Sequence, residues 1–235
     1  YNGYKSELVS LKEARENKFN INWNNRKIPK PNFIGIKEVM NYTVSDLRPY
    51  IDWTFFFIAW EMKKLYPDIL EDSAYGKEAK KIFNDANKML YFIEENNIVD
   101  IKGVFGIFKA NSNGDNIELY NKDKSLAATF NLFREQRKKN KGPYLCLSDF
   151  IAPKEINKDD YLGGFIVTTG LKTDEYVKKL ESEGDSYNAI MLKLVCDRLA
   201  EAFAEKLHED IRKNYWGYAK DENLSMKEIF KASYR

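Results

Sequence analysis

Four polar side chains recur along one predicted helix near the C-terminal end of the sequence. Asp197, Glu201, Glu205 and His208 are spaced four, four and three residues apart, so a helix places them on one face. Whatever this protein binds, this polar stripe is a candidate place for it.

Glu205-x-x-His208 is also half of the pattern that holds a carboxylate-bridged pair of metal ions. A complete site needs a second Glu-x-x-His, and the sequence has one histidine in all. A Ser-His-Asp or Cys-His centre would need the same histidine, and no nucleophile-elbow motif accompanies it. We therefore expect no metal site and no self-contained catalytic centre, with His208 paired to a carboxylate on its own helix. A di-metal oxidase, which bound iron or manganese would reveal, remains an alternative.

The second candidate is Asp52, a lone carboxylate inside the aromatic stretch 50–60. Because burying an unpartnered carboxylate is costly, Asp52 must be hydrogen-bonded, paired or solvated. It can cap the next helix, bind a ligand, or do both. With Glu201 and the aromatic residues, it suits a ligand that carries an amino or cationic group. The pattern by itself favours the other interpretation, in which the aromatic residues are core and Glu201 lies on a solvated face.

A single long helix, predicted from Ser186 to about Lys213, positions the polar stripe. At about 1.5 Å per residue it would span about 40 Å, enough to cross a domain of this size. Asp185 or Ser186 can cap its first turn. Its apolar positions recur at helical spacing: Tyr187, Ile190, Met191, Leu194, Val195, Leu199, Phe203, Leu207 and Ile211.

The remaining elements follow from caps, turns and periodicity. Helices are predicted after Ser10, after Thr43 or Ser45, over 76–94, over 173–183 and from Ser225 to about Tyr234, and strands over 104–109, 117–121, 125–133, 144–151 and 161–169. Asn113-Gly114 predicts a hairpin between the first two strands. Gly217 is predicted to end the long helix. The basic run 134–141 is predicted to be a solvated turn, with a docking surface as the alternative. Helices, then strands, then helices predict an α+β fold with a largely antiparallel sheet flanked by helices.

The composition narrows the class of protein. The 235 residues, 43% of them hydrophobic, can bury a sizeable core. Lys and Arg number 38 against 36 Asp and Glu, so no strong basic field exists to bind a nucleic-acid backbone. The sequence shows no signal-type start and no apolar run of membrane length. The two cysteines lack metal-type spacing, which predicts a reduced, cytoplasmic protein.

Several stretches match one known family in its own order along nearly the whole chain. The sequence resembles the C-terminal activation (reactivation) domain of cobalamin-dependent methionine synthase. The matching residues are Tyr50-Ile51-Asp52-Trp53-Thr54 with Phe56-Phe57, Tyr66-Pro67, Asp149-Phe150-Ile151-Ala152-Pro153, Asp160-Tyr161, Asp197-Arg198-Leu199-Ala200-Glu201-Ala202-Phe203-Ala204-Glu205, Leu207-His208-Glu209 and Trp216-Gly217-Tyr218.

The resemblance implies a twisted, C-shaped α+β domain that binds S-adenosylmethionine (AdoMet). In the family, cobalamin that has oxidised to cob(II)alamin is restored by an electron from flavodoxin or a reductase and a methyl group from AdoMet. Cobalamin itself would be bound by a neighbouring domain of the same polypeptide. In the family, the carboxylate at the position of Asp52 contacts AdoMet, and the glutamate at the position of Glu201 lies near the same ligand, so both are expected to be binding residues. No catalytic acid or base is implied, because the sulfonium of AdoMet is already an activated methyl donor.

The sequence also departs from the family. Phe55 stands where the family usually has proline, and the family continues beyond Arg235 into an Arg-Pro-x-x-Gly-Tyr-Pro segment. The resemblance therefore predicts one activation domain over 1–235 without its C-terminal part, with 1–45 as an extended and helical arm. Such a piece is expected to be inactive by itself. The alternative function is a docking module that caps the cobalamin domain and recruits flavodoxin without binding AdoMet.

Overall fold

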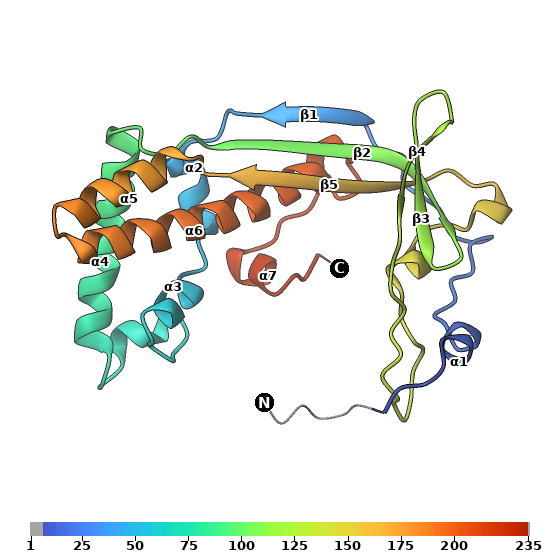
Figure 1. The fold of residues 1–235 in the computed structure, drawn as a ribbon, viewed down its shortest axis with the longest axis horizontal. Coiled ribbons are helices and arrows are strands. Elements are labelled where there is room, and N and C mark those ends of the chain that lie inside the picture. Colours follow the sequence, from blue (N-terminus) through green and yellow to red (C-terminus); the bar gives the residue numbers. More distant parts are fainter. Residues whose placement is uncertain (1–6, 235) are drawn as a thin grey trace. The chain divides into compact units, whose positions relative to one another are not determined.

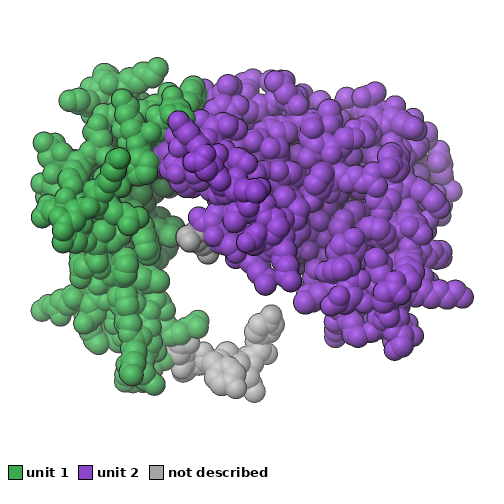
Figure 2. All heavy atoms as spheres, turned by 180° about the vertical axis from the view of Figure 1, so that it is seen from behind, with its two compact units in different colours: residues 1–35, 106–164 green, residues 36–105, 165–235 purple. Residues whose placement is uncertain are grey.

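The structure is a computed structural model that describes residues 7–234 (Figure 1). The chain forms two compact units, coloured separately in Figure 2. Unit 1 comprises residues 1–35 and 106–164, and unit 2 comprises residues 36–105 and 165–235. No helix within residues 7–234 joins the length and the apolar character that crossing a membrane requires.

Unit 2 is built around the predicted long helix, α6 (Ser186–Asp210). Four other helices of this unit pack against it: α2 (Val44–Leu47), α3 (Trp53–Ala59), α4 (Gly76–Glu95) and α5 (Lys172–Ser182). Leu192, Leu199, Phe203 and Leu207 of α6 are fully buried. Because these positions are seven, four and four residues apart, α6 presents them along one side, as its sequence predicts.

The helices begin where the sequence predicts their caps. Asp185 accepts from the Asn188 amide at 3.1 Å and starts α6. Thr43 caps α2, and Ser10 caps α1 (Leu11–Glu16) of unit 1. Ser225 caps α7 (Met226–Phe230), which is shorter than predicted. A π-helical turn over Ile211–Tyr215 follows α6, and Gly217, at φ +83°, ends it as expected.

The five strands form a largely antiparallel sheet, which confirms the α+β prediction. The strands are β1 (Gly35–Val39), β2 (Lys102–Asn113), β3 (Asn116–Tyr120), β4 (Leu126–Phe130) and β5 (Asp160–Thr168). Their order is β1-β2-β3-β4, with β5 also paired to β2. The predicted hairpin joins β2 to β3, with Asn113 opposite Asn116. Within unit 2, β2 approaches α6 closely, since a Cβ on Gly103 would lie 2.9 Å from Phe203.

The strand predicted over 144–151 is wrong, because this part of unit 1 turns into a 3₁₀ helix over Leu147–Phe150. Its side chains do alternate between buried and exposed from Tyr144 to Ser148, which is the pattern that suggested a strand. The backbone turns because Asp149 accepts a hydrogen bond from the Cys146 amide, three residues earlier, at 2.9 Å. The hydrogen bond from the Cys146 amide to Asp149 therefore determines the backbone here, although the side chains alternate between buried and exposed as in a strand.

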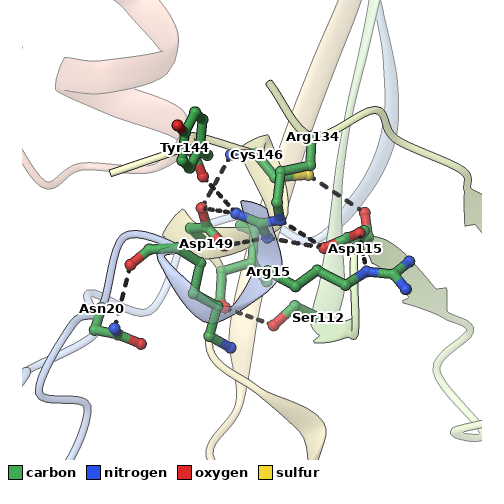
Figure 3. Close-up of polar contacts among 10 residues, drawn as sticks. Arg15, Asn20, Ser112, Asp115, Arg134, Tyr144, Cys146 and Asp149 are labelled. Carbon is green, nitrogen blue, oxygen red and sulfur yellow. Dashed lines mark hydrogen bonds and ion pairs between the residues drawn. The ribbon is translucent and has the colours of Figure 1, made fainter. Parts of the chain in front are cut away.

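The solvated turn predicted over 134–141 is wrong for its first residue. Arg134 is only 5% exposed and forms a two-pronged ion pair with Asp149, at 2.7 and 2.8 Å (Figure 3). Its Nε also donates to Asp115, which accepts from Arg15 on its other oxygen. The pKa of Asp115 is lowered, because Arg15 and Arg134 outweigh the effect of burial. Arg134 thus joins three segments of unit 1 that are distant in sequence.

The first prediction concerns this buried cation. Arg134→Met leaves two carboxylates without their shared partner, so we expect the free energy of unfolding to fall by about 3–5 kcal/mol. The matched control is Arg137→Met in the same basic run, because Arg137 is exposed and forms no ion pair within residues 7–234. Urea unfolding of both variants measures the difference. Equal losses in the two variants would contradict the structural role of Arg134.

A second prediction concerns the pH dependence of unit 1. Hydrogen bonds from Asn113, Lys154 and Tyr120 lower the pKa of Glu118 from 4.5 to about 2. A carboxyl whose pKa is depressed by folding stabilises the fold above its unfolded pKa and loses that effect as pH falls. The stability advantage of the wild type over Glu118→Gln should therefore be complete near pH 6 and disappear between pH 4.5 and 2. A stability advantage that persists unchanged at pH 2 would contradict the effect of the lowered pKa of Glu118.

Candidate functional site

Two tyrosine hydroxyl groups fix the segment before Asp52 onto the end of α6. Tyr42 donates to Asp210 at 2.5 Å, and Tyr50 donates to Glu209. Burial, together with the neighbouring carboxylate, raises the pKa of both hydroxyl groups well above the ordinary value. Both tyrosines therefore stay protonated and keep donating across the physiological range. The long helix thus positions the residues that follow Tyr50.

Asp52 is the N-cap of α3, as one of the two predicted roles requires. Its Oδ1 accepts from the Thr54 amide at 2.9 Å. No hydrogen bond from residues 7–234 reaches its other oxygen, and Asp52 is half-buried. Three buried rings of α3, Trp53, Phe56 and Phe57, hold the helix in place. The cap therefore leaves one carboxylate oxygen available to a ligand.

Asp52 lines a pocket of about 1230 Å³ that lies entirely within unit 2. Five aromatic side chains share its wall: Trp53, Phe55, Tyr66, Phe83 and Phe230. The ring of Phe83 is packed against those of Trp53, at 4.8 Å, and Tyr66, at 5.6 Å. Phe55, which replaces the usual proline of the resembled family, is 56% exposed and contributes to this wall. The pocket thus combines a free carboxylate oxygen with aromatic surfaces.

Several further polar residues of the wall come from three elements. Arg48 belongs to a 3₁₀ turn before Asp52, Asn84 and Asn87 belong to α4, and Lys227 and Lys231 belong to α7 and its C-cap. Arg48 donates to the side-chain oxygen of Asn87 at 2.6 Å. The sequence pattern singles out none of these residues. The signal available for Arg48 was its place in a capped turn, four residues before Asp52.

Glu201 does not line this pocket. Its side chain is 71% exposed on α6, and the nearest cation that it pairs with is Arg198, at 4.0 Å. Asp197 is exposed as well, whereas Glu205 and His208 are half-buried. The pocket brings Asp52 together with Arg48 and the two asparagines rather than with the polar stripe of α6.

Glu205 and His208, the C-terminal half of the polar stripe, lie in a separate cluster of side chains. The pKa of Glu205 is raised by burial, against the effect of Arg212, and one of its oxygens is buried without a hydrogen bond. The fully buried Arg212 pairs with Glu222 and lies 3.9 Å from the ring of Tyr234. The ring of His208 lies 4.9 Å from that of Tyr234 and 6.3 Å from that of Phe165. No group of three or more potential metal ligands occurs among the described residues.

Comparisons with known proteins identify the family of the chain. Residues 43–235 match the family model for the activation domain of vitamin B12-dependent methionine synthase. The chain is also similar to a solved structure described as the MetH reactivation domain bound to AdoHcy, with a TM-score of 0.94 and 43% identity. The alignment covers 97% of this chain and 70% of that chain. Since the family model covers most of the chain, including Asp52 and α6, the protein belongs to the family of vitamin B12-dependent methionine synthase activation domains.

Proposed function

We propose that this chain binds AdoMet in the pocket at Asp52 and presents its methyl group for the reactivation of cobalamin. The observation that carries the proposal is the free oxygen of Asp52 within an aromatic-lined pocket. The related MetH domain was solved with AdoHcy, which is AdoMet without the transferred methyl group.

The pocket residues fit the chemistry of AdoMet. The ligand carries an amino group, a sulfonium, a carboxylate and a flat adenine ring. A carboxylate oxygen pairs with the amino group, and aromatic faces attract a desolvated cation and stack on a flat ring. Ligand pockets commonly enclose about 300–1,000 Å³, so a pocket of about 1230 Å³ has room for the whole molecule.

The chain's own contribution to methyl transfer is to bind and orient. AdoMet supplies an activated methyl group when bound, so no proton has to be moved by a side chain. Reactivation combines that methyl group and one electron with cob(II)alamin, giving methylcobalamin and AdoHcy. We propose that a neighbouring domain of the same polypeptide holds the cobalamin and that flavodoxin or another reductase supplies the electron. Two buried free cysteines, Cys146 and Cys196, support a reducing, cytoplasmic setting.

A third prediction tests the proposed ligand. In calorimetry, Asp52→Asn should weaken AdoMet binding about tenfold or more, because a hydrogen bond to a charged group is lost. Asp185→Asn is the matched control, since Asp185 is also an N-cap aspartate but does not line the pocket. Asparagine caps helices about as well as aspartate, so both variants should fold. A wild-type protein that does not bind AdoMet would overturn the proposal and favour the docking module.

The contact predicted between Glu201 and the same ligand has its own test. A carboxylate that is 71% exposed interacts with a cation through solvent of high dielectric constant. We therefore expect Glu201→Gln to weaken AdoMet binding by only about two- to threefold, the size of an exposed charge interaction. Asp197→Asn, one turn earlier on the same face, is the control. An unchanged affinity in Glu201→Gln would remove Glu201 from the site.

A further inference from the structure

Strand β4 of unit 1 has one side that no other strand occupies. Among residues 7–234, β4 pairs only with β3, beside which it is labelled in Figure 1. Ala127 forms a bulge in this pairing, which is regular from Ala128 onward. Outside it, no hydrogen bond within residues 7–234 involves residues 126–133. Since an edge strand presents unpaired N–H and C=O groups, β4 can accept a further strand.

The sequence of β4 does not protect this edge. Proteins commonly guard an edge strand with charged residues or proline, and β1, at the other end of the sheet order, carries Lys37 and Glu38. Residues 126–133 contain neither a charged residue nor proline. All five residues of β4 are exposed. Leu126, Phe130 and the following Phe133 are 56%, 48% and 97% exposed, so the edge is apolar as well as open.

β4 also extends the apolar face of the sheet in unit 1. Phe130 lies opposite Ile117 and Ala128 lies opposite Leu119 in the pairing with β3. Ile117 and Leu119 belong to a buried hydrophobic cluster, against which the partly buried Leu132 also packs. The apolar face of this cluster therefore continues onto a strand that residues 7–234 leave exposed.

We propose that β4 pairs with the β4 of a second copy of this chain, antiparallel and centred on Phe130. In this register Ala128 lies opposite Leu132 of the other copy, Thr129 lies opposite Asn131, and Phe130 lies opposite its own equivalent. Apolar residues meet on the face that carries the cluster, and polar residues meet on the other face. The edge is therefore complementary to itself, and the absence of charge means that no like charges come together.

The symmetry and the size of this contact determine what it forms. Each copy uses the same edge, so the pairing closes at two chains. Stable interfaces bury about 1,200–2,000 Å², which a strand of this length does not reach, so we expect a weak dimer that forms as the protein concentration rises. The inference does not rest on the proposed function, because the AdoMet pocket belongs to unit 2 and β4 belongs to unit 1.

Sedimentation velocity of the whole chain at increasing concentration tests the dimer. The wild type should pass from monomer to dimer. Ala128→Lys should stay monomeric at every concentration, because an inward-pointing lysine on an edge strand prevents pairing. The matched control is Ile36→Lys, which adds the same charge to an exposed position of β1 and should dimerise as the wild type does. Circular dichroism checks that both variants are folded.

Disulfide trapping tests the register without relying on a loss. Phe130→Cys places the two introduced thiols opposite each other, where cross-strand Cβ atoms lie about 4.5–5.5 Å apart and a disulfide can form. Leu126→Cys is the control on the same strand: its two thiols would be about eight residues apart, or about 27 Å. Under mild oxidation only Phe130→Cys should give linked dimers. The native Cys146 and Cys196 are buried.

Each contrary result would overturn the proposal. A wild type that stays monomeric would leave the edge to a strand from another protein. A dimer that Ala128→Lys does not weaken would place the contact elsewhere on the molecule. Equal cross-linking in Phe130→Cys and Leu126→Cys would contradict the pairing centred on Phe130. Species larger than two chains would contradict a closed, symmetric contact.

Discussion

The burial of one side of α6 is the constraint on which the rest of unit 2 depends. Its apolar positions are covered by α2, α3, α4 and α5, so a single helix fixes the places of four others. The end of the same helix carries Glu209 and Asp210, which accept hydrogen bonds from Tyr50 and Tyr42. The aromatic segment is therefore attached to α6 by hydrophobic packing and by two hydroxyl–carboxylate contacts. These contacts determine the position of Asp52, although α6 contributes no residue to the pocket.

This arrangement explains how a carboxylate can be structural and still be free to bind. Capping α3 needs one oxygen of Asp52, and the aromatic side chains that follow it anchor the helix without using the other oxygen. Burying a carboxylate oxygen without a partner is unfavourable, which is why Asp52 stands at a pocket wall rather than inside the core. The two roles that the sequence allows for Asp52, a cap and a ligand contact, are therefore compatible in one geometry.

Local signals in the sequence predict most of the fold. Caps and helical periodicity identified α6 and α4, and the Asn113-Gly114 pair identified the β2–β3 hairpin. Tertiary partners account for the failures. Arg134 lies in a run that resembles a solvated turn, and only the distant Asp115 and Asp149 make it a buried residue. At the site, Asp52 was identifiable because a lone charge among aromatic residues is conspicuous. Arg48 was not, since its significance depends on Asn87 and Tyr91 of α4.

Asp52 and Glu201, the two carboxylates that the family resemblance indicates, differ in their exposure to solvent. Glu201 and Asp52 are both acidic, but a residue's electrostatic effect on a ligand depends on how far water screens it. Asp52 is half-buried against aromatic rings, whereas the Glu201 side chain is 71% exposed on α6. Methyl transfer from a sulfonium needs positioning more than acid or base catalysis, and positioning requires contacts that do not move. The turn that leads to Asp52 meets this requirement, because buried Leu47 and Ile51 hold its backbone in place.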